Sequence, residues 1–418
     1  MNETTTHLSQ GLDYYKLTMG DVIYEHHPNE QVTFTLKNRS ETDQLSRYVS
    51  VETLQARLDG IAQRGFNAEE IAYYAGLQAQ DGTARFTQQY LDHLADLQLP
   101  LVDVTQNTDT NELQVQVAGA WQDVSLWETV VMSEINELYY QQLIEQQGLD
   151  ITTIYGEGER RLSDKIARIR ARPDIQLADF GTRRRFSAHW HEHVIKRLAA
   201  ECPDNLTGTS NPWFAYRYNL MPIGTFAHEM PMVYAGLADS NGEDPLSGHH
   251  QMLDDWQQHY NGDLSVALSD TFTSEFFFSD FTQQQAQQWA GLRHDSGSPI
   301  DFGEQVIEFY REHGVDPLTK TIVFSDGLNI DAIETIAGHF GGRIKILFGW
   351  GTNLMNDMGL PANNFVMKAT HVNGVDTVKL SDDNGKHTGP EALVQRYQSL
   401  VRRRIGTSAM NAAAIQTS

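Results

Sequence analysis

The sequence predicts an α/β protein, an irregular TIM-like α/β barrel with a smaller discontinuous α+β domain. Of the 418 residues, 40% are hydrophobic and 10% aromatic, which is enough for a large core. Between residues 175 and 353, short continuous apolar runs alternate with helical patterns, as in a parallel sheet buried on both faces. Before residue 125, apolar residues instead recur at every second position, as in a half-exposed sheet.

The first domain is predicted over residues 1–124. Its strands are marked by two alternating sets of apolar residues, Val32, Phe34 and Leu36, and Leu113, Val115 and Val117. The segment Ser125-Leu-Trp-Glu128 has the spacing of a capping box and predicts the start of a helix, which Gly148 ends.

The barrel domain is predicted over residues 125–363. Its strands are expected in seven apolar runs, 175–185, 205–211, 221–229, 264–272, 292–299, 321–329 and 344–353. Seven such units favour a closed or nearly closed barrel over an open sheet. The number is one short of eight, so the sequence does not decide closure.

The last part of the chain returns to alternating hydrophobicity. Residues 364–390 are predicted to form a hairpin with Asn373-Gly374 at its turn and to complete the first domain. A helix near 391–404 and a frayed tail are expected to make up residues 391–418.

Charge and cysteine content exclude several classes of protein. The formal net charge is −24, which disfavours nucleic acid or an anionic membrane as partner. The single cysteine, Cys202, excludes an intramolecular disulfide. The start of the chain lacks the features of a signal peptide, and no apolar stretch approaches the roughly twenty residues of a spanning helix. We therefore expect a cytoplasmic protein.

Polar residues gather where the predicted barrel strands end. They are Thr182 to Arg185, Thr209 to Asn211, Thr225, His228, Glu229, Asp270, Thr271, Arg293 to Ser296, Ser325, Asp326, Gly349, Gly351 and Thr352. The reacting groups of barrel enzymes lie at the carboxyl ends of the strands. Because all seven predicted strands end in polar residues, the sequence predicts an active-site face at their carboxyl ends.

Two features of this face suit anions. Gly349-Trp-Gly351-Thr352 follows the last apolar run, and glycine amides with a threonine hydroxyl suit a phosphate, although a tight turn explains the glycines equally well. Arg183 and Arg293 lie beside strand ends, where guanidinium groups suit phosphate or carboxylate oxygens. Arg184 and Arg185 are expected to point outward from the following helix.

Carboxylates and one histidine complete the candidate site. Asp295 and Asp326 each follow a strand and suit Mg²⁺ or sugar hydroxyls, or else form turns. His228 suits nucleophilic attack on a phosphoryl group, with Glu229 beside it as a candidate orienting carboxylate, or is a hydrogen-bonded core residue. Met232 stands where a zinc H-E-x-x-H motif needs its second histidine, so no such metal site is expected.

Seven collinear motifs resemble those of the nicotinate phosphoribosyltransferase family. They are LDYYKLTMGD (12–21), DFGTRRRFS (179–187), GTSN (208–211), PIGTFAHE (222–229), GLRHDSG (291–297), VFSDGLN (323–329) and FGWGT (348–352). The resemblance implies an enzyme of NAD biosynthesis and salvage. It would join nicotinate to phosphoribosyl pyrophosphate (PRPP), with ATP as co-substrate and Mg²⁺ as cofactor, in a homodimer with shared active sites.

The resemblance also assigns roles to individual residues. Phe180 would stack on the pyridine ring, with Tyr15 of the neighbouring subunit on its other face. The nicotinate and ribosyl pocket would be lined by Arg183, Ser210, Thr225 and Arg293. The 5′-phosphate loop would comprise Gly349, Gly351 and Thr352, and Ser325 and Asp326 are added to the phosphate-binding set. Asp295 would bind ribose and, through pyrophosphate, Mg²⁺, and ATP would phosphorylate His228, with Glu229 and Arg293 in the catalytic set.

Ser210 favours nicotinate over nicotinamide, because the nicotinamide-using relatives carry an acid there that would repel a carboxylate. Ser298 and Asn329 depart from the family, which often has Asp at both positions. Three alternatives stay open: a nicotinamide phosphoribosyltransferase, a phosphosugar lyase or isomerase, and a phosphohistidine relay without catalysis.

Overall fold

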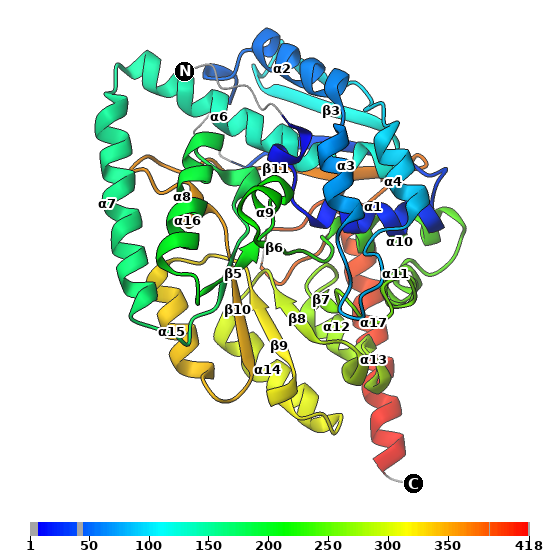
Figure 1. Cartoon of the computed structure of the whole chain (residues 1–418). Coiled ribbons are helices and arrows are strands. Elements are labelled where there is room, and N and C mark those ends of the chain that lie inside the picture. Colours follow the sequence, from blue (N-terminus) through cyan, green and yellow to red (C-terminus); the bar gives the residue numbers. More distant parts are fainter. Residues whose placement is uncertain (1–6, 40–44, 384, 417–418) are drawn as a thin grey trace. The chain divides into compact units, whose positions relative to one another are not determined.

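The computed structural model describes residues 7–39, 45–383 and 385–416 (Figure 1). The chain forms two compact units. Unit 1 comprises Met1–Gly224, Leu328–Ile333 and Phe348–Lys368. Unit 2 comprises Thr225–Gly327, Glu334–Leu347 and Ala369–Ser418. Each unit is thus built from three separate stretches of chain. The domain boundaries drawn from the sequence follow the type of element, and they stay a prediction.

Most of the described chain is helical. The α-helices are α1 (Tyr15–His26), α2 (Val51–Arg64), α3 (Ala68–Ala75), α4 (Gln88–Ala95), α5 (Trp121–Val124), α6 (Trp127–Gln147), α7 (Ile151–Arg170), α8 (Ala188–Glu201), α9 (Pro212–Tyr218), α10 (Glu229–Ser240), α11 (Pro245–Tyr260), α12 (Ser274–Asp280), α13 (Gln283–Gln288), α14 (Pro299–Glu312), α15 (Ile330–Phe340), α16 (Thr352–Met355) and α17 (Glu391–Gln416). Short 3-10 helices are η1 (Leu8–Gly11), η2 (Leu45–Arg47), η3 (Thr182–Arg184) and η4 (Pro317–Thr319). No helix within the described residues is long and apolar enough to cross a bilayer.

An antiparallel sheet has the strand order β12-β11-β1-β3-β2. Its strands are β1 (Gln31–Asn38), β2 (Asp103–Gln106), β3 (Leu113–Ala120), β11 (Phe365–Val372) and β12 (Val375–Asp376). In β1 and β3 every second side chain is buried, with Phe34 opposite Val117. The two alternating strands predicted from the sequence are therefore confirmed.

A curled parallel sheet has the strand order β6-β5-β4-β10-β9-β8-β7. Its strands are β4 (Leu177–Asp179), β5 (Leu206–Thr209), β6 (Met221–Pro222), β7 (Val266–Leu268), β8 (Gly291–His294), β9 (Thr321–Phe324) and β10 (Lys345–Trp350). Each of the seven predicted runs overlaps one of these strands, with β8 starting one residue before its run, so the α/β prediction is confirmed. Because β6 and β7 stand at the two ends of the order, the sheet is a half-barrel.

The predicted hairpin is present between β11 and β12. Val372 pairs with Val375, so Asn373 and Gly374 form a two-residue turn, and both have positive φ, 49° and 82°. Asn and Gly adopt this left-handed backbone at least cost, as a type I′ turn requires.

The predicted capping box at Ser125 is wrong, although the helix is present and ends at Gly148 (φ 61°). Leu126 is the N-cap of α6 and makes no side-chain cap. The Nζ atom of Lys16 instead lies 2.7 Å from Glu128 and donates to the hydroxyl of Ser125. A fully buried ammonium needs these partners more than a helix start needs a cap.

The helix expected near 391–404 is longer than predicted. α17 continues to Gln416 and ends beside the C-terminus (Figure 1). Its last part contains the run Ala412 to Ala414, and alanine is the strongest helix former. The expected frayed tail is therefore helical as far as residue 416.

Candidate active site

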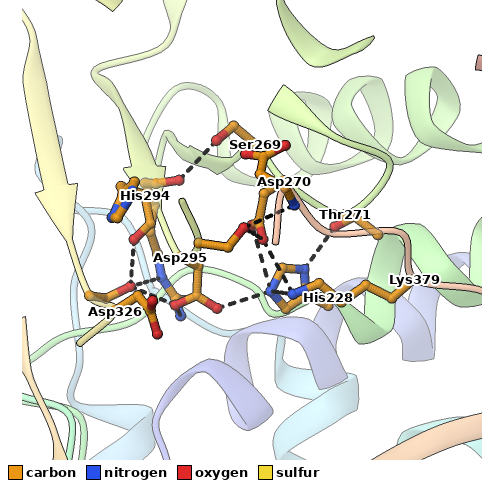
Figure 2. A network of polar contacts seen from close by, with 12 residues as sticks. His228, Ser269, Asp270, Thr271, His294, Asp295, Asp326 and Lys379 are labelled. Atoms are coloured by element: carbon orange, nitrogen blue, oxygen red, sulfur yellow. Dashed lines mark hydrogen bonds and ion pairs between the residues drawn. The ribbon is translucent and has the colours of Figure 1, made fainter. Parts of the chain in front are cut away.

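Five polar side chains of unit 2 surround one another and form what we call the histidine cluster (Figure 2). His228 is the N-cap of α10, Asp270 and Thr271 follow β7, Asp295 follows β8, and Lys379 follows β12. Figure 2 shows the side chains of Asp270, Asp295 and Lys379 pointing toward the ring of His228. Segments distant in sequence therefore meet at the carboxyl ends of β7 and β8.

The ring of His228 is held at both nitrogens. Nδ1 lies 2.9 Å from Oγ1 of Thr271. Nε2 lies 3.0 Å from Oδ2 of Asp295 and 2.9 Å from Nζ of Lys379. A neutral imidazole carries one N–H, so Nε2 either donates to Asp295 or accepts from Lys379. The two contacts at this nitrogen therefore correspond to two tautomers of the ring.

The surroundings of His228 keep it uncharged. Burial and, after it, the charge of Lys379 lower the pKa of His228 to about 4, against the opposing pull of Asp270 and Asp295. Burial opposes the charge of Asp295 too, but Arg293 beside it holds the pKa of that carboxyl well below its usual range. At neutral pH the cluster thus contains a neutral, nucleophilic imidazole between ionised carboxylates.

Arg293, Asp295 and Ser325, predicted separately, are in mutual contact. Arg293 donates from Nε to Oγ of Ser325 (2.8 Å) and from Nη2 to Oδ1 of Asp295 (3.0 Å). Ser325 Oγ also lies 2.8 Å from Oδ1 of Asp295. The single carboxylate of Asp295 therefore links the guanidinium group to the ring of His228.

Three other predicted residues of unit 2 lie near this cluster in sequence. Thr225 donates its hydroxyl to the carbonyl of Val266 in β7 (3.0 Å). Glu229 is buried in the first turn of α10. Burial raises the pKa of Asp326, whose carboxylate lies 3.6 Å from Nζ of Lys386. The binding and catalytic roles expected for them stay predictions.

A second group lies in unit 1 around the buried carboxylate of Asp13, and we call it the Asp13 cluster. Arg183 donates to Oδ2 of Asp13 (2.9 Å) and to the hydroxyl of Tyr15 (3.3 Å). Ser210 donates to Oδ1 of Asp13 (2.6 Å). Arg183 and Ser210 therefore share one carboxylate that sequence reasoning missed, and Tyr15 joins the group through Arg183. The only signal was its place in the motif LDYYKLTMGD.

Tyr15 reaches this cluster from its own chain. The resemblance assigned it to the neighbouring subunit's site, yet its ring and hydroxyl lie beside Arg183 of the same chain. The reason is local, because the segment that leads into α1 is bound to β5, with the amide of Tyr14 donating to the carbonyl of Ser210 (2.5 Å). The contact with Arg183 therefore needs no second subunit.

The glycines of the predicted phosphate loop make room for Phe180. A β-carbon on Gly349 would lie 2.3 Å from the ring of Phe180, and one on Gly351 would lie 3.2 Å from its carbonyl oxygen. Gly349 is part of β10, and Thr352 is the first residue of α16. Packing alone thus requires glycine at position 349, and the phosphate contact stays a prediction.

The turn that carries Phe180 is supported by another residue that sequence reasoning missed, Asp179. Its carboxylate, fully buried, accepts from Nε2 of His191 (2.7 Å), Oγ1 of Thr209 (2.6 Å) and the amide of Gly181 (2.7 Å). An acid at the end of a buried strand was the available signal. Asp179 ties the ends of β4 and β5 to α8 and so positions the aromatic ring.

The expectation that Arg184 and Arg185 point outward is wrong. Arg185 is fully buried and its Nε donates to Glu137 of α6 (2.8 Å), and Arg184 donates to the carbonyl of Asn363 (3.2 Å). The cause is η3, a single tight turn, which directs Arg185 toward α6 and Arg184 toward the segment before β11. The sequence suggested an exposed helix face.

The histidine cluster also bears on the Mg²⁺ predicted at Asp295. Ligand atoms of His228, Asp270 and Asp295 lie within 4.8 Å of one another, and two carboxylates suit a divalent cation. However, Nζ of Lys379 lies 3.3 Å from Oδ2 of Asp270 and already supplies positive charge there. These side chains therefore fit a metal ion that arrives with the phosphates of a substrate better than a resident one.

Comparison with known proteins gives a consistent result. The model of the nicotinate phosphoribosyltransferase (NAPRTase) family matches residues 175–400, and the model of the NAPRTase N-terminal domain matches residues 12–136. A crystal structure of nicotinate phosphoribosyltransferase from Porphyromonas gingivalis is 28% identical with a TM-score of 0.84, covering 95% of this chain and 100% of that chain. The corresponding structure from Vibrio cholerae is 27% identical with a TM-score of 0.83, covering 99% of both. The chain belongs to the nicotinate phosphoribosyltransferase family.

Proposed function

We propose that the protein forms nicotinate mononucleotide and pyrophosphate from nicotinate and PRPP, with ATP hydrolysis coupled through a phosphohistidine at His228. Family membership supports the transfer reaction. The observation that carries the coupling is the neutral, buried imidazole of His228 between Thr271, Asp295 and Lys379. The reaction would supply NAD biosynthesis.

The Asp13 cluster is proposed to hold the base. Arg183 supplies guanidinium N–H donors for the nicotinate carboxylate, and its contact with Asp13 neutralises the buried acid. The single hydroxyl hydrogen of Ser210 points to Asp13, so Ser210 has to rotate before it donates to a substrate. Phe180 offers an aromatic face for the pyridine ring. Acid specificity is therefore proposed to depend on Arg183 as well as on Ser210.

Transfer at C1′ needs positioning more than a strong base. Pyrophosphate leaves with the electron pair of the C1′–O bond, an oxocarbenium-like state forms, and the lone pair of the pyridine nitrogen makes the new C–N bond. Asp295 is ionised and suits the developing positive charge and the ribose hydroxyls, and Arg293 orients it. Mg²⁺ bound to the pyrophosphate would neutralise the leaving group.

The contacts of the His228 ring support the proposed ATP coupling. Nε2 lies between Asp295 and Lys379, whereas Nδ1 faces the hydroxyl of Thr271, which rotates easily. We propose that Nδ1 attacks the γ-phosphorus. A P–N bond forms, the bond to the bridging oxygen breaks, and ADP leaves with the electron pair. Water later cleaves the P–N bond and releases phosphate.

The test is product analysis by chromatography with PRPP, Mg²⁺ and either nicotinate or nicotinamide, with and without ATP. We expect nicotinate mononucleotide, formed faster with ATP, and one ADP for each turnover. Preference for nicotinamide would favour the alternative, a nicotinamide phosphoribosyltransferase. Absence of any mononucleotide would contradict both assignments.

We also propose that the protein is a cytoplasmic homodimer with shared active sites, as the family resemblance implies. Tyr15 contacts Arg183 of its own chain (3.3 Å), so the proposed sharing does not rest on Tyr15. Sedimentation velocity, followed by activity measurements on mixtures of two inactive variants, tests both parts. A monomer that is fully active at nanomolar concentration would contradict the dimer.

A further inference from the structure

Lys379 is a buried lysine whose Nζ atom lies 2.9 Å from Nε2 of His228. It belongs to a segment held firmly in unit 2, because its backbone exchanges hydrogen bonds with Thr388 (3.1 and 2.9 Å). The next amide, that of Leu380, donates to the carbonyl of Thr271 (2.8 Å). The ammonium group is therefore placed beside His228 by the backbone and not by a flexible surface loop.

The second contact of Lys379 is with Asp270. Its Nζ atom lies 3.3 Å from Oδ2 of Asp270, which also accepts from the hydroxyl of Ser296 (2.6 Å). The other oxygen, Oδ1, lies 3.7 Å from Nε2 of His228 and is buried with no hydrogen-bond donor among the described residues. Lys379 is therefore the cation in contact with this carboxylate.

Charges around His228 are balanced in pairs. Arg293 pairs with Asp295, and Lys379 pairs with Asp270. With a neutral imidazole the four groups sum to zero. Without Lys379, the buried carboxylate of Asp270 would leave one negative charge where the polyanionic phosphates of ATP must approach.

We propose that Lys379 is a positioning residue that neutralises Asp270 beside the ring of His228, so that the γ-phosphate of ATP can reach the ring. This inference rests on the proposed phosphorylation of His228. It assigns the ATP-coupling machinery a component from residues 364–390, the segment predicted to complete the other domain. Because Lys379 is proposed to act through charge balance, a second substitution that restores neutrality should recover the labelling rate. A purely structural residue would not give this recovery.

The experiment measures transfer of radioactive phosphate from γ-labelled ATP to the full chain. We expect Lys379→Met to lower the labelling rate at low ATP roughly 100-fold, mainly through a higher KM for ATP, because one buried charge is left unpaired. Lys379→Arg keeps the charge and should label within about tenfold of the unmodified protein. Lys345→Met, at an exposed lysine where β10 begins, is the matched control and should label normally.

The decisive variant is the double substitution Lys379→Met with Asp270→Asn. It restores neutrality and should label at least about tenfold faster than Lys379→Met alone. Circular dichroism checks that each variant is folded. Normal labelling of Lys379→Met, or a folded double variant no faster than Lys379→Met, would overturn the inference. Absence of label in the unmodified protein would instead refute the phosphohistidine itself, and the role of Lys379 with it.

Discussion

Several buried aspartates of this protein are stabilised by basic side chains that neutralise their charge. Asp13, Asp179 and Asp270 are each nearly inaccessible, and each contacts a basic side chain, Arg183, His191 and Lys379 respectively. Such groups are costly to bury alone and so are found with partners. These pairings keep the carboxylates ionised, so a reactive group beside them, such as His228, lies in a fixed electrostatic environment.

Replacing His228 tests the proposed coupling directly. We expect His228→Ala to abolish the stimulation by ATP and to leave slow transfer without it, because the C1′ chemistry needs no imidazole. Product formation with and without ATP measures both. His189→Ala, at an exposed histidine of α8, is the control and should behave normally. Loss of all transfer in a well-folded His228→Ala variant would contradict the separation of the two roles.

Stability should respond to pH through the same histidine. The folded-state pKa of His228 is about 4, below its ordinary value of 6.5. The unfolded chain therefore binds a proton first, so this group's contribution is full above pH 6.5 and is lost as the pH falls toward 4. The loss amounts to about 3 kcal/mol in the free energy of unfolding.

Urea unfolding at pH 7 and pH 5 measures about 2 kcal/mol of this loss, because pH 5 still lies above the folded-state pKa of His228. The comparison variant is His228→Gln, which cannot titrate. It should show a smaller decrease between the two pH values than the unmodified protein. An equal decrease in both proteins would show that His228 does not contribute.

Residues that make contacts far along the chain were the ones that sequence reasoning missed. His228, Arg293 and Asp295 were predicted because each follows a recognisable strand. Lys379 lies in an alternating hairpin region with nothing to indicate His228, 151 positions away, as its partner. Sequence spacing carries no information about such pairs.

At the scale of elements, the parallel strands were predictable because each is a continuous apolar run followed by polar residues. Helix starts were less so, since the spacing of Ser125 and Glu128 fits a capping box and the buried Lys16 uses both residues instead. The turn after β4 was misjudged for a similar reason. Three consecutive arginines suggest solvent, yet Arg185 is fully buried and paired with Glu137 in a different helix.

The strand β10 offers a test of close packing. Gly349→Ala places a methyl group 2.3 Å from the ring of Phe180, so the ring must move. We expect a loss of about 1–3 kcal/mol in the free energy of unfolding and a higher KM for nicotinate. Gly338→Ala in α15 is the control, since nothing lies within 4 Å of the new methyl, and it should raise stability by up to about 1 kcal/mol. Unchanged KM in Gly349→Ala would argue against base stacking on Phe180.

For the whole molecule, the formal charge of −24 is the dominant electrostatic fact. Self-repulsion of this size destabilises a compact state, and salt screens it over about 10 Å at 0.1 M. We therefore expect the melting temperature to rise between 10 and 300 mM NaCl, as followed by scanning calorimetry. A falling melting temperature would mean that surface ion pairs such as Arg396–Asp239 outweigh the net repulsion.

The α/β class and the seven parallel strands followed from sequence pattern, whereas the open half-barrel form of the sheet and the division into compact units did not. Residues 225, 328, 334, 348 and 369 each begin a stretch that belongs to a different unit from the residue before. The strands β10 and β11 are themselves divided between the units. Local hydrophobic periodicity does not show where the chain passes from one unit to the other. It depends only on which faces of a strand are buried and not on which part of the chain covers them.

This interleaving has a consequence for how the protein is made. A nascent chain leaves the ribosome from its N-terminus, and the last stretch of unit 1, Phe348–Lys368, emerges only after most of unit 2. The first 224 residues therefore cannot complete unit 1 until nearly nine tenths of the polypeptide has been synthesised. Until then β4 lacks the second half of β10 as its neighbouring strand. Truncation products that end before residue 348 should accordingly bind chaperones or be degraded, since neither unit is whole.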